Sequence, residues 1–205
     1  GIEDLRGKTI YSSGKGATPE YSLDYILKSN GIDPTKDVNI EYKSEHTECL
    51  AAVLNDENGI ALLPQPFVTT ALMKNKNLRV ALDLTKEWEK INKNNDEKSS
   101  LVTGVLVARR EFVDKYPEKV KNFLEEYKES VDFTNNNIEA AAKLIGENEI
   151  VKEEVAKKAI PECNITYIDN TEMQNKLSGY LKVLYDANPK SIGGKLPSED
   201  FYYIK

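Results

Sequence analysis

Residues 9–27 read TIYSSGKGATPEYSLDYIL, a pattern that predicts a strand, a Gly-rich turn and a helix. The strand is expected over residues 8–12, where apolar and polar side chains alternate. Thr18 is a suitable N-cap, and Pro19 then occupies the first helical position, where its missing N–H costs nothing. The side chains expected to face the core recur at helical spacing: Leu23, Ile26 and Leu27.

Strands and helices continue to alternate as far as residue 84, which predicts an α/β fold with a parallel or mostly parallel sheet. Ile60–Leu63 is a short uninterrupted apolar run, typical of a strand that is covered on both faces. The run stops at Pro64-Gln65-Pro66. The other elements expected are strands at 38–42 and 78–82 and helices at 47–55 and 67–74.

The second half of the chain has a different pattern. Residues 92–100 (NKNNDEKSS) contain no apolar side chain and predict a linker. A strand is expected over 101–109, and the segment after it is helical in pattern, with Phe and Tyr residues between 112 and 133 at core spacing. The expected helices lie at 111–134, with a new start near Pro117, and at 137–146, 150–159 and 171–187.

We therefore divide the chain into an α/β ligand-binding lobe, residues 1–100, and a crossover strand with a helical part, residues 101–205. Amphipathic helices need an apolar surface to lie on. Those of the second part either coat the sheet of the first, or belong to another lobe whose strands are not in this sequence. In the second case their exposed apolar faces would favour dimerisation.

The composition excludes several classes of function. The 205 residues carry a net charge of −6, with a pI near 5.1, which argues against nucleic acid or anionic lipid as the partner. One histidine and two widely separated cysteines form no metal-binding spacing, so no metal and no cofactor is expected, and both cysteines are expected to be buried. No Ser-His, Cys-His or paired-carboxylate grouping is close in sequence, so no enzymatic activity is expected. Neither a membrane-spanning run nor a signal peptide is expected.

The turn after the first strand is the principal candidate for a ligand site. Ligands of open α/β sheets bind outside the carboxyl ends of the strands, and a helix N-terminus favours an anion. Two alternatives stay open: a plain connection, or a nucleotide-phosphate loop, although neither GxxxxGK[ST] nor GxGxxG is present. The residues proposed to contact a ligand are Ser12, Ser13, Gly14, Lys15, Gly16, Ala17, Thr18, Pro64, Gln65, Thr103 and Gly104.

Some of these residues can also be explained by the fold alone, and the same holds for His46 and Trp88. The prolines around Gln65 can simply end a strand, and Thr103-Gly104 can be a β-bulge as readily as a hinge. His46 is interpreted as a solvated loop residue or cap more readily than as a ligand contact. Trp88 is expected to pack against the lobe.

Several longer segments resemble one family of proteins. These are DLRGKTI followed by TPEYSLDYILKSNGIDP, then CLAAVLNDENGIALLPQPFVTTAL, then VTGVLVARREFVDKYPEKVKNFLEEYKESVDFTNNN, and finally IGGKLPSEDFYY. In this order they resemble the substrate-binding proteins of ABC importers, in the nitrate/sulfonate/taurine and thiamine-precursor branch. The resemblance covers essentially the whole chain. It implies a lobe like that of type II periplasmic binding proteins, with C-terminal helices of a second, partly missing lobe.

The resemblance also implies a function. It predicts a non-enzymatic component that binds a small solute such as nitrate, a sulfonate or a thiamine precursor. It also predicts an ABC permease as partner and an extracytoplasmic location through a lipid anchor outside this sequence. Family members carry a further segment before DLRGK, so the chain resembles the latter two-thirds of such a protein. The alternatives are a ligand-sensing domain or a domain like the thiamine-pyrimidine synthases, although the Cys-rich motif of those synthases is missing.

Overall fold

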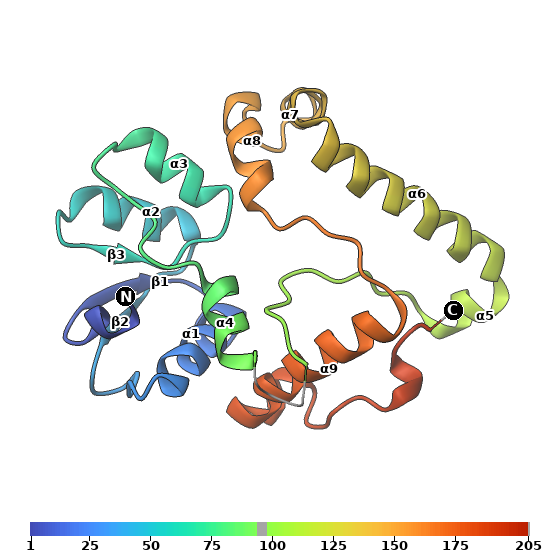
Figure 1. The fold of residues 1–205 in the computed structure, drawn as a ribbon, viewed down its shortest axis with the longest axis horizontal. Helices are drawn as coiled ribbons and strands as arrows, with labels where there is room; N and C mark the ends of the chain where they lie inside the picture. Colours follow the sequence, from blue (N-terminus) through green and yellow to red (C-terminus); the bar gives the residue numbers. More distant parts are fainter. Residues whose placement is uncertain (94–97, 205) are drawn as a thin grey trace. The chain divides into compact units, whose positions relative to one another are not determined.

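The computed structural model describes residues 1–93 and 98–204, drawn in Figure 1. The chain folds into two units. One is made of residues 1–103 together with 168–205, and the other of residues 104–167.

The first unit contains a three-stranded parallel sheet. Its strands are β1 (Thr9–Ser12), β2 (Asn39–Tyr42) and β3 (Ile60–Ala61), in the order β2-β1-β3. The predicted α/β fold with a parallel sheet is therefore confirmed. The expectation for Ile60–Leu63 is wrong in one respect: the strand is shorter, Ile60–Ala61, and its residues are only half-buried at the edge of the sheet that the described residues form.

Within the described residues, five helices accompany this sheet, four of them close to their predicted bounds. They are α1 (Thr18–Ser29), α2 (His46–Asn55), α3 (Phe67–Lys74), α4 (Leu84–Asn92) and α9 (Asn170–Ala187), with short 3-10 helices η1 (Ile2–Leu5), η3 (Pro189–Ile192) and η4 (Glu199–Phe201). The N-cap of α1 is Ala17 rather than Thr18. Pro19 still lies in the first turn, where a missing N–H is tolerated.

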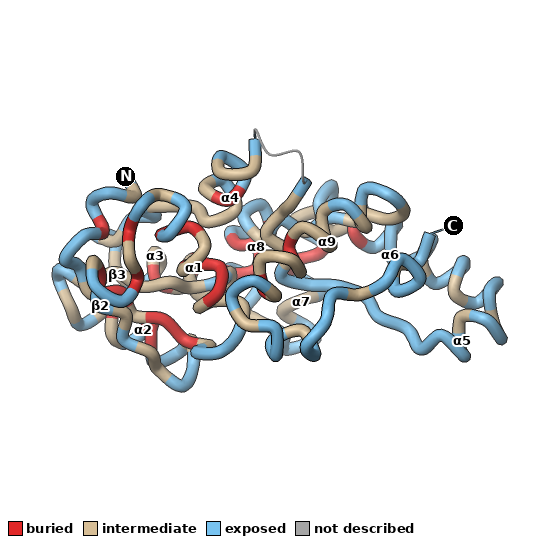
Figure 2. The backbone as a smooth tube through the Cα atoms, turned by 90° about the horizontal axis from the view of Figure 1, so that it is seen from below, coloured by how far each residue is buried: buried red, intermediate tan, exposed pale blue. Residues whose placement is uncertain are grey.

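Helix α1 takes part in two hydrophobic clusters of the first unit, and Figure 2 shows its buried stretches in red. Leu23 and Leu27 belong to the cluster beside the sheet. Tyr21 and Ile26 belong to a second cluster around Trp88, which is fully buried as predicted. The second cluster also contains Tyr180 and Leu184 of α9, which explains why residues 168–205 pack with the first unit.

Three expectations about the middle of the chain are corrected by this arrangement. Residues 78–82 and 101–109 form no strand, because no described strand pairs with them and a strand needs a neighbour for its backbone hydrogen bonds. In the predicted linker 92–100, residues 94–97 lie outside the described part, whereas Ser99 is packed and bonded to Trp88. Residues 168–205, assigned by sequence to the part 101–205, fold with residues 1–103.

The second unit is helical. It contains α5 (Arg110–Lys115), α6 (Pro117–Asn136), α7 (Ile138–Glu147), α8 (Glu153–Ala159) and η2 (Ile160–Glu162), and the new helix start at Pro117 is as predicted. Its core cluster consists of three alanines and one isoleucine: Ala141, Ala142, Ala156 and Ile160. The aromatic residues along α5 and α6 were expected in a core. Instead Phe112, Phe123, Tyr127 and Phe133 are exposed, since the unit offers no sheet for them to cover.

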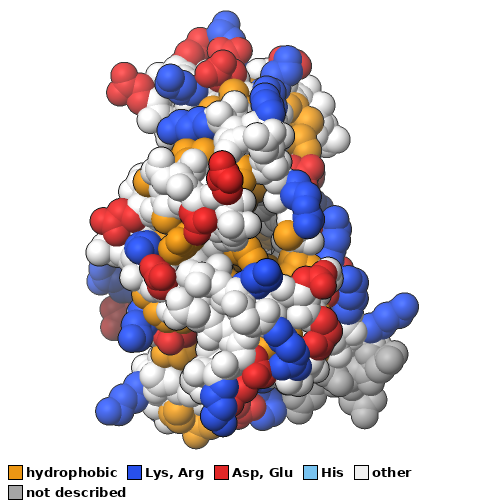
Figure 3. Space-filling view, turned by 90° about the vertical axis from the view of Figure 1, so that its left-hand side faces the viewer, with side chains coloured by type: hydrophobic (Ala, Val, Ile, Leu, Met, Phe, Trp, Pro, Cys, Tyr) orange, Lys and Arg blue, Asp and Glu red, His pale blue; other side chains and the backbone are white. Residues whose placement is uncertain are grey.

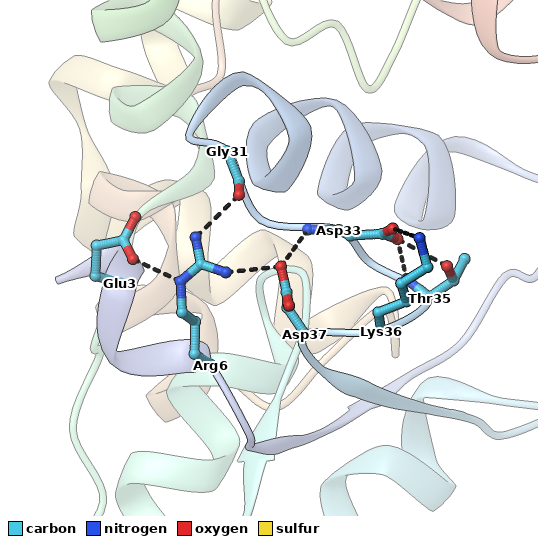
Figure 4. A network of polar contacts seen from close by, with 7 residues as sticks. All are labelled: Glu3, Arg6, Gly31, Asp33, Thr35, Lys36 and Asp37. Carbon is cyan, nitrogen blue, oxygen red and sulfur yellow. Dashed lines mark hydrogen bonds and ion pairs between the residues drawn. The ribbon is translucent and has the colours of Figure 1, made fainter.

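The entry into β1 is fixed by a polar network around Arg6 (Figure 4). The Arg6 guanidinium donates to Glu3 (2.8 Å), to Asp37 (2.6 Å) and to the carbonyl of Gly31 (2.9 Å). Asp37 also accepts from the backbone amide of Asp33 (2.8 Å). The network therefore joins η1, the end of α1 and the loop before β2, and it holds β1 and β2 in register.

Asp33 in the same network gives a prediction for acid stability. Hydrogen bonds from the Thr35 hydroxyl and amide, and then from Lys36, lower the pKa of the Asp33 carboxyl from 3.8 to about 2. A lowered pKa in the folded state means that the stabilisation is present above pH 3.8 and is lost as the pH falls toward 2. Asp33→Asn should therefore lower the stability at neutral pH and flatten its decline in acid.

Urea unfolding followed by circular dichroism, at a series of pH values from neutral to about 2, measures this effect. Glu57→Gln is the matched control. Glu57 is exposed, so this substitution removes one carboxylate without changing the network. Parallel pH profiles for Asp33→Asn and the wild type would contradict the prediction.

Candidate functional site

The three strands of the first unit run parallel, so their carboxyl ends meet at one edge of the sheet. Three segments leave this edge: the turn after Ser12, the loop after Tyr42, and the loop from Leu62 to Pro66. Sequence analysis assigned ligand contacts to the first and third of these segments. The structure brings all three together.

The contact that joins them is made by Ser13, His46 and Phe67. The Ser13 hydroxyl lies 2.7 Å from Nδ1 of His46, the first residue of α2. The His46 ring in turn lies against Phe67, the first residue of α3, with ring centroids 5.3 Å apart. No Ser–His grouping is close in sequence, but the parallel sheet brings together Ser13 and His46, which are 33 positions apart.

The turn between β1 and α1 depends on two glycines with left-handed backbone. Gly14 has φ = 69° and Gly16 has φ = 78°, a region that other residues rarely adopt. A Cβ atom on Gly14 would also lie 2.9 Å from Cγ of Pro19, closer than side chains approach one another. The amide of Ala17 donates to the Gly14 carbonyl at 3.0 Å, which closes the turn.

Backbone amides of this turn are available to an anion. Among residues 1–93 and 98–204, no acceptor is present for the amides of Gly14, Lys15 and Thr18. The positive end of the α1 dipole lies at the same place. The amide of Gly16 differs from these three, because it donates to the Glu20 carboxylate.

Lys15 is the positive side chain of the turn. Its Nζ atom lies over the ring of Tyr42, 5.6 Å from the centroid, so it contacts the end of β2. Burial raises the pKa of Tyr42, and the negative charges of Glu20 and Asp24 raise it further. Tyr42 therefore lies near the carboxylates of Glu20 and Asp24 as well as near the Lys15 ammonium.

The remaining proposed residues have partners within the fold. Ser12 is fully buried, and its hydroxyl donates to the Ser13 carbonyl at 3.1 Å. The side-chain oxygen of Gln65 accepts from the amide (3.1 Å) and the hydroxyl (2.8 Å) of Thr69, so it helps to begin α3. The Thr18 hydroxyl oxygen lies 3.3 Å from the Tyr180 hydroxyl on α9.

Pro64, Thr103 and Gly104 are exposed. Pro64 follows β3 at the edge described above. Thr103 and Gly104 lie where the first unit ends and the second begins, the position expected of a hinge. Their part in ligand binding stays a prediction.

Sequence reasoning gave too little weight to His46 and missed Phe67, Glu20 and Tyr42. One signal was present in the sequence: each of Tyr42, His46 and Phe67 ends a predicted strand or lies a few residues beyond one, and in a parallel sheet such positions converge. The contact between Glu20 and Gly16 depends on the left-handed turn, which residue types alone do not specify.

Neither metal binding nor thiol chemistry is indicated at this edge. Across the described residues, no cluster of His, Cys, Asp and Glu is suited to a metal ion. Cys49 is buried as predicted, and burial raises the pKa of its thiol. Cys163, also expected to be buried, is only half-buried. Acidic and basic side chains are interspersed over the face shown in Figure 3.

No described helix combines the length and the apolar character that crossing a membrane requires.

The fold matches those of two solved structures, which confirms the predicted fold like that of type II periplasmic binding proteins. An ABC transporter protein from Parabacteroides distasonis superposes with a TM-score of 0.79 over 96% of the chain, at 23% identity. The periplasmic aliphatic sulphonate binding protein SsuA from Escherichia coli superposes with a TM-score of 0.71 over 100% of the chain, at 16% identity. The chain spans 66% and 62% of the lengths of these two proteins.

Sequence comparison gives the family. Residues 33–175 match the family described as menaquinone biosynthesis, and the chain belongs to that family. Among curated proteins, none matches the sequence significantly. The two solved structures support the predicted resemblance at the level of the fold, and the branch suggested by the sequence motifs stays a prediction.

Proposed function

We propose that this chain is a non-enzymatic binding module for a small solute with an anionic group, held at the carboxyl edge of the sheet. The observation that carries the proposal is the Ser13–His46 contact beside the amides of the turn. Those amides and the positive end of α1 would hold the anion. Phe67 supplies an apolar wall next to the imidazole.

Ser13 acts through His46 in this proposal. Ser13 is only 4% exposed, whereas His46 is half-buried and accessible from the edge. When the hydroxyl donates to Nδ1, the neutral ring carries its proton on Nε2 and can donate to an oxygen of the solute. The described part of the chain places no carboxylate in hydrogen-bond contact with the imidazole, so a Ser-His-Asp arrangement is not formed, which favours binding over nucleophilic catalysis.

The more specific form of the proposal is the solute-binding component of an ABC importer. It is supported by the fold shared with an ABC transporter protein and with a sulphonate-binding protein. A nitrate, sulfonate or thiamine-precursor-like solute, an extracytoplasmic location, a lipid anchor and a permease partner belong to this proposal. Closure around Thr103-Gly104 would be its motion. Dimerisation through exposed apolar side chains such as Val107 (76% exposed) also stays a prediction.

A second candidate is a function in menaquinone biosynthesis, as an enzyme or as a carrier of an intermediate. One observation favours it: the family match covers residues 33–175 and carries that description. The same edge of the sheet would then hold an acidic intermediate of that pathway. Product analysis after incubation with the bound solute separates the two candidates, because a transport protein returns its solute unchanged.

A double-mutant cycle tests the proposed site. A thermal-shift screen of small oxyanions, sulfonates, carboxylates and thiamine precursors first selects a binder, since a bound solute raises the melting temperature. Ser13→Ala is then expected to weaken binding about tenfold, the effect of losing one well-placed hydrogen bond. His46→Ala should weaken it at least as much. The double variant should lose no more than His46→Ala alone, because the two residues act as one unit.

The matched control is Ser29→Ala, the same change at the exposed end of α1. It should leave the affinity unchanged. Unaltered binding by both Ser13→Ala and His46→Ala, with folding verified by circular dichroism, would reject the site and leave the turn a structural connection.

A further inference from the structure

The Glu20 carboxylate is already bonded to the turn at which we place the anion. Glu20 lies in the first turn of α1, and its carboxylate accepts from the backbone amide of Gly16. The left-handed conformation at Gly16 presents that amide to the carboxylate. The protein itself therefore places a negative group at the rim of a site that otherwise favours anions.

Other charged groups lie near Glu20. Asp24 is one turn further along α1, and the charges of Glu20 and Asp24 both act on the Tyr42 hydroxyl at the end of β2, over whose ring the Lys15 ammonium lies. Lys28 pairs with Asp24 at 3.3 Å. The Ser13 hydroxyl and His46 Nδ1 lie 2.7 Å apart near the same turn, and Glu45 precedes His46 as the N-cap of α2. A solute whose anionic group is held by the amides of the turn would thus meet the Glu20 carboxylate beside that group.

We infer that Glu20 determines the charge pattern of the solute. It favours a molecule whose anionic group is accompanied, a short distance away, by an ammonium or hydroxyl group, and it rejects a molecule with a second anionic group. This inference rests on the proposed function, since it concerns the same site. Coulomb repulsion between two carboxylate-like charges some 6 to 10 Å apart near a protein surface corresponds to a factor of about ten or more in affinity.

Two matched series of probes test the inference. The sulfonate series is 2-aminoethanesulfonate, ethanesulfonate and ethane-1,2-disulfonate. The carboxylate series is β-alanine, propionate and succinate. Within each series the molecules share one anionic head and differ only in the second group, which is an ammonium, a methyl or a second anion. Affinities are measured by isothermal titration calorimetry at one low ionic strength, because salt screens the effect.

The wild type is expected to bind the ammonium probe best and the dianion worst. Glu20→Gln keeps an oxygen that can accept from the Gly16 amide but removes the charge. It should therefore raise the affinity for the dianion about tenfold and lower the affinity for the ammonium probe by a similar factor. Glu20→Asp keeps the charge and should keep the wild-type order. Glu57→Gln removes an equal charge before β3, at the opposite edge of the sheet, and should change nothing.

The outcomes separate this inference from the proposed function. Suppose that Ser13→Ala weakens the binding of every probe, while Glu20→Gln leaves the order and the ratios of the probe affinities unchanged. The proposed site is then retained, but Glu20 only caps the turn, and the inference is overturned. If the dianion binds Glu20→Gln but not the wild type, the inference is supported. If no probe of either series binds the wild type or Glu20→Gln, both proposals are rejected.

Discussion

Replacing Trp88 by alanine is expected to lower the free energy of unfolding of the first unit by about 3 to 5 kcal/mol. Trp88 is fully buried in α4, with the rings of Tyr25 and Tyr180 at 4.4 Å and 5.5 Å. Its indole N–H donates to the Ser99 hydroxyl at 3.1 Å. Alanine would leave a cavity between α1, α4 and α9 and would remove the donor from Ser99.

The loss of stability in Trp88→Ala should also weaken the packing of the C-terminal segment, residues 168–205, on the first unit. Tyr180 and Leu184 of α9 belong to the same cluster as Trp88, so residues 168–205 should become sensitive to proteolysis in Trp88→Ala. Urea unfolding must be followed by circular dichroism, since Trp88 is the only tryptophan of the sequence. Trp88→Phe is the intermediate control: it keeps an aromatic ring but removes the indole N–H and part of the buried ring, so it should lose less stability than Trp88→Ala. A loss below about 1 kcal/mol in Trp88→Ala would contradict this account of the core.

Local signals in the sequence predicted the helices of this fold well. Helix α3 has the predicted bounds of Phe67 and Lys74, and α6 begins at Pro117 as expected. Both are specified by apolar periodicity and by proline positions, which act within a few residues. The strands expected at 78–82 and 101–109 are absent, because a strand also needs a neighbouring strand, and residue type at one position carries no information about that neighbour.

The same limit applies to the site: features set by neighbouring residues could be predicted, whereas contacts between distant residues could not. The turn with Gly14 and Gly16 was predicted from its composition, and the structure gives both residues the left-handed backbone that glycine tolerates. The partnership of Ser13 with His46 joins residues 33 positions apart, and only the order β2-β1-β3 brings them to one edge. Sequence reasoning could place each residue near an edge, but it could not choose which of them touch.

Gly179→Ala should destabilise the first unit, although the same change in an ordinary helix stabilises by about 1 kcal/mol. Gly179 lies inside α9, and a Cβ atom there would lie 2.3 Å from the carbonyl oxygen of Lys98 and 2.8 Å from Cβ of Ser99. The Lys98 carbonyl is backbone, so it cannot rotate away as a flexible side chain would. Either α9 or residues 98–99 must shift, and overpacking of this kind costs about 1 to 3 kcal/mol or more.

The predictions for Trp88→Ala and Gly179→Ala both test the packing of residues 98–99. Residues 98–99 lie between α4 and α9: Trp88 is bonded to Ser99 from α4, and Gly179 allows the close approach of α9. Ser178→Ala is the matched control, because it alters the adjacent position of the same helix and should change the free energy of unfolding by less than about 0.5 kcal/mol. Because the Trp88 and Gly179 variants disturb the same packed segment, their losses in a double variant should fall short of the sum. Additive losses, or a Gly179→Ala variant as stable as the wild type, would mean that this segment does not tie α9 to α4.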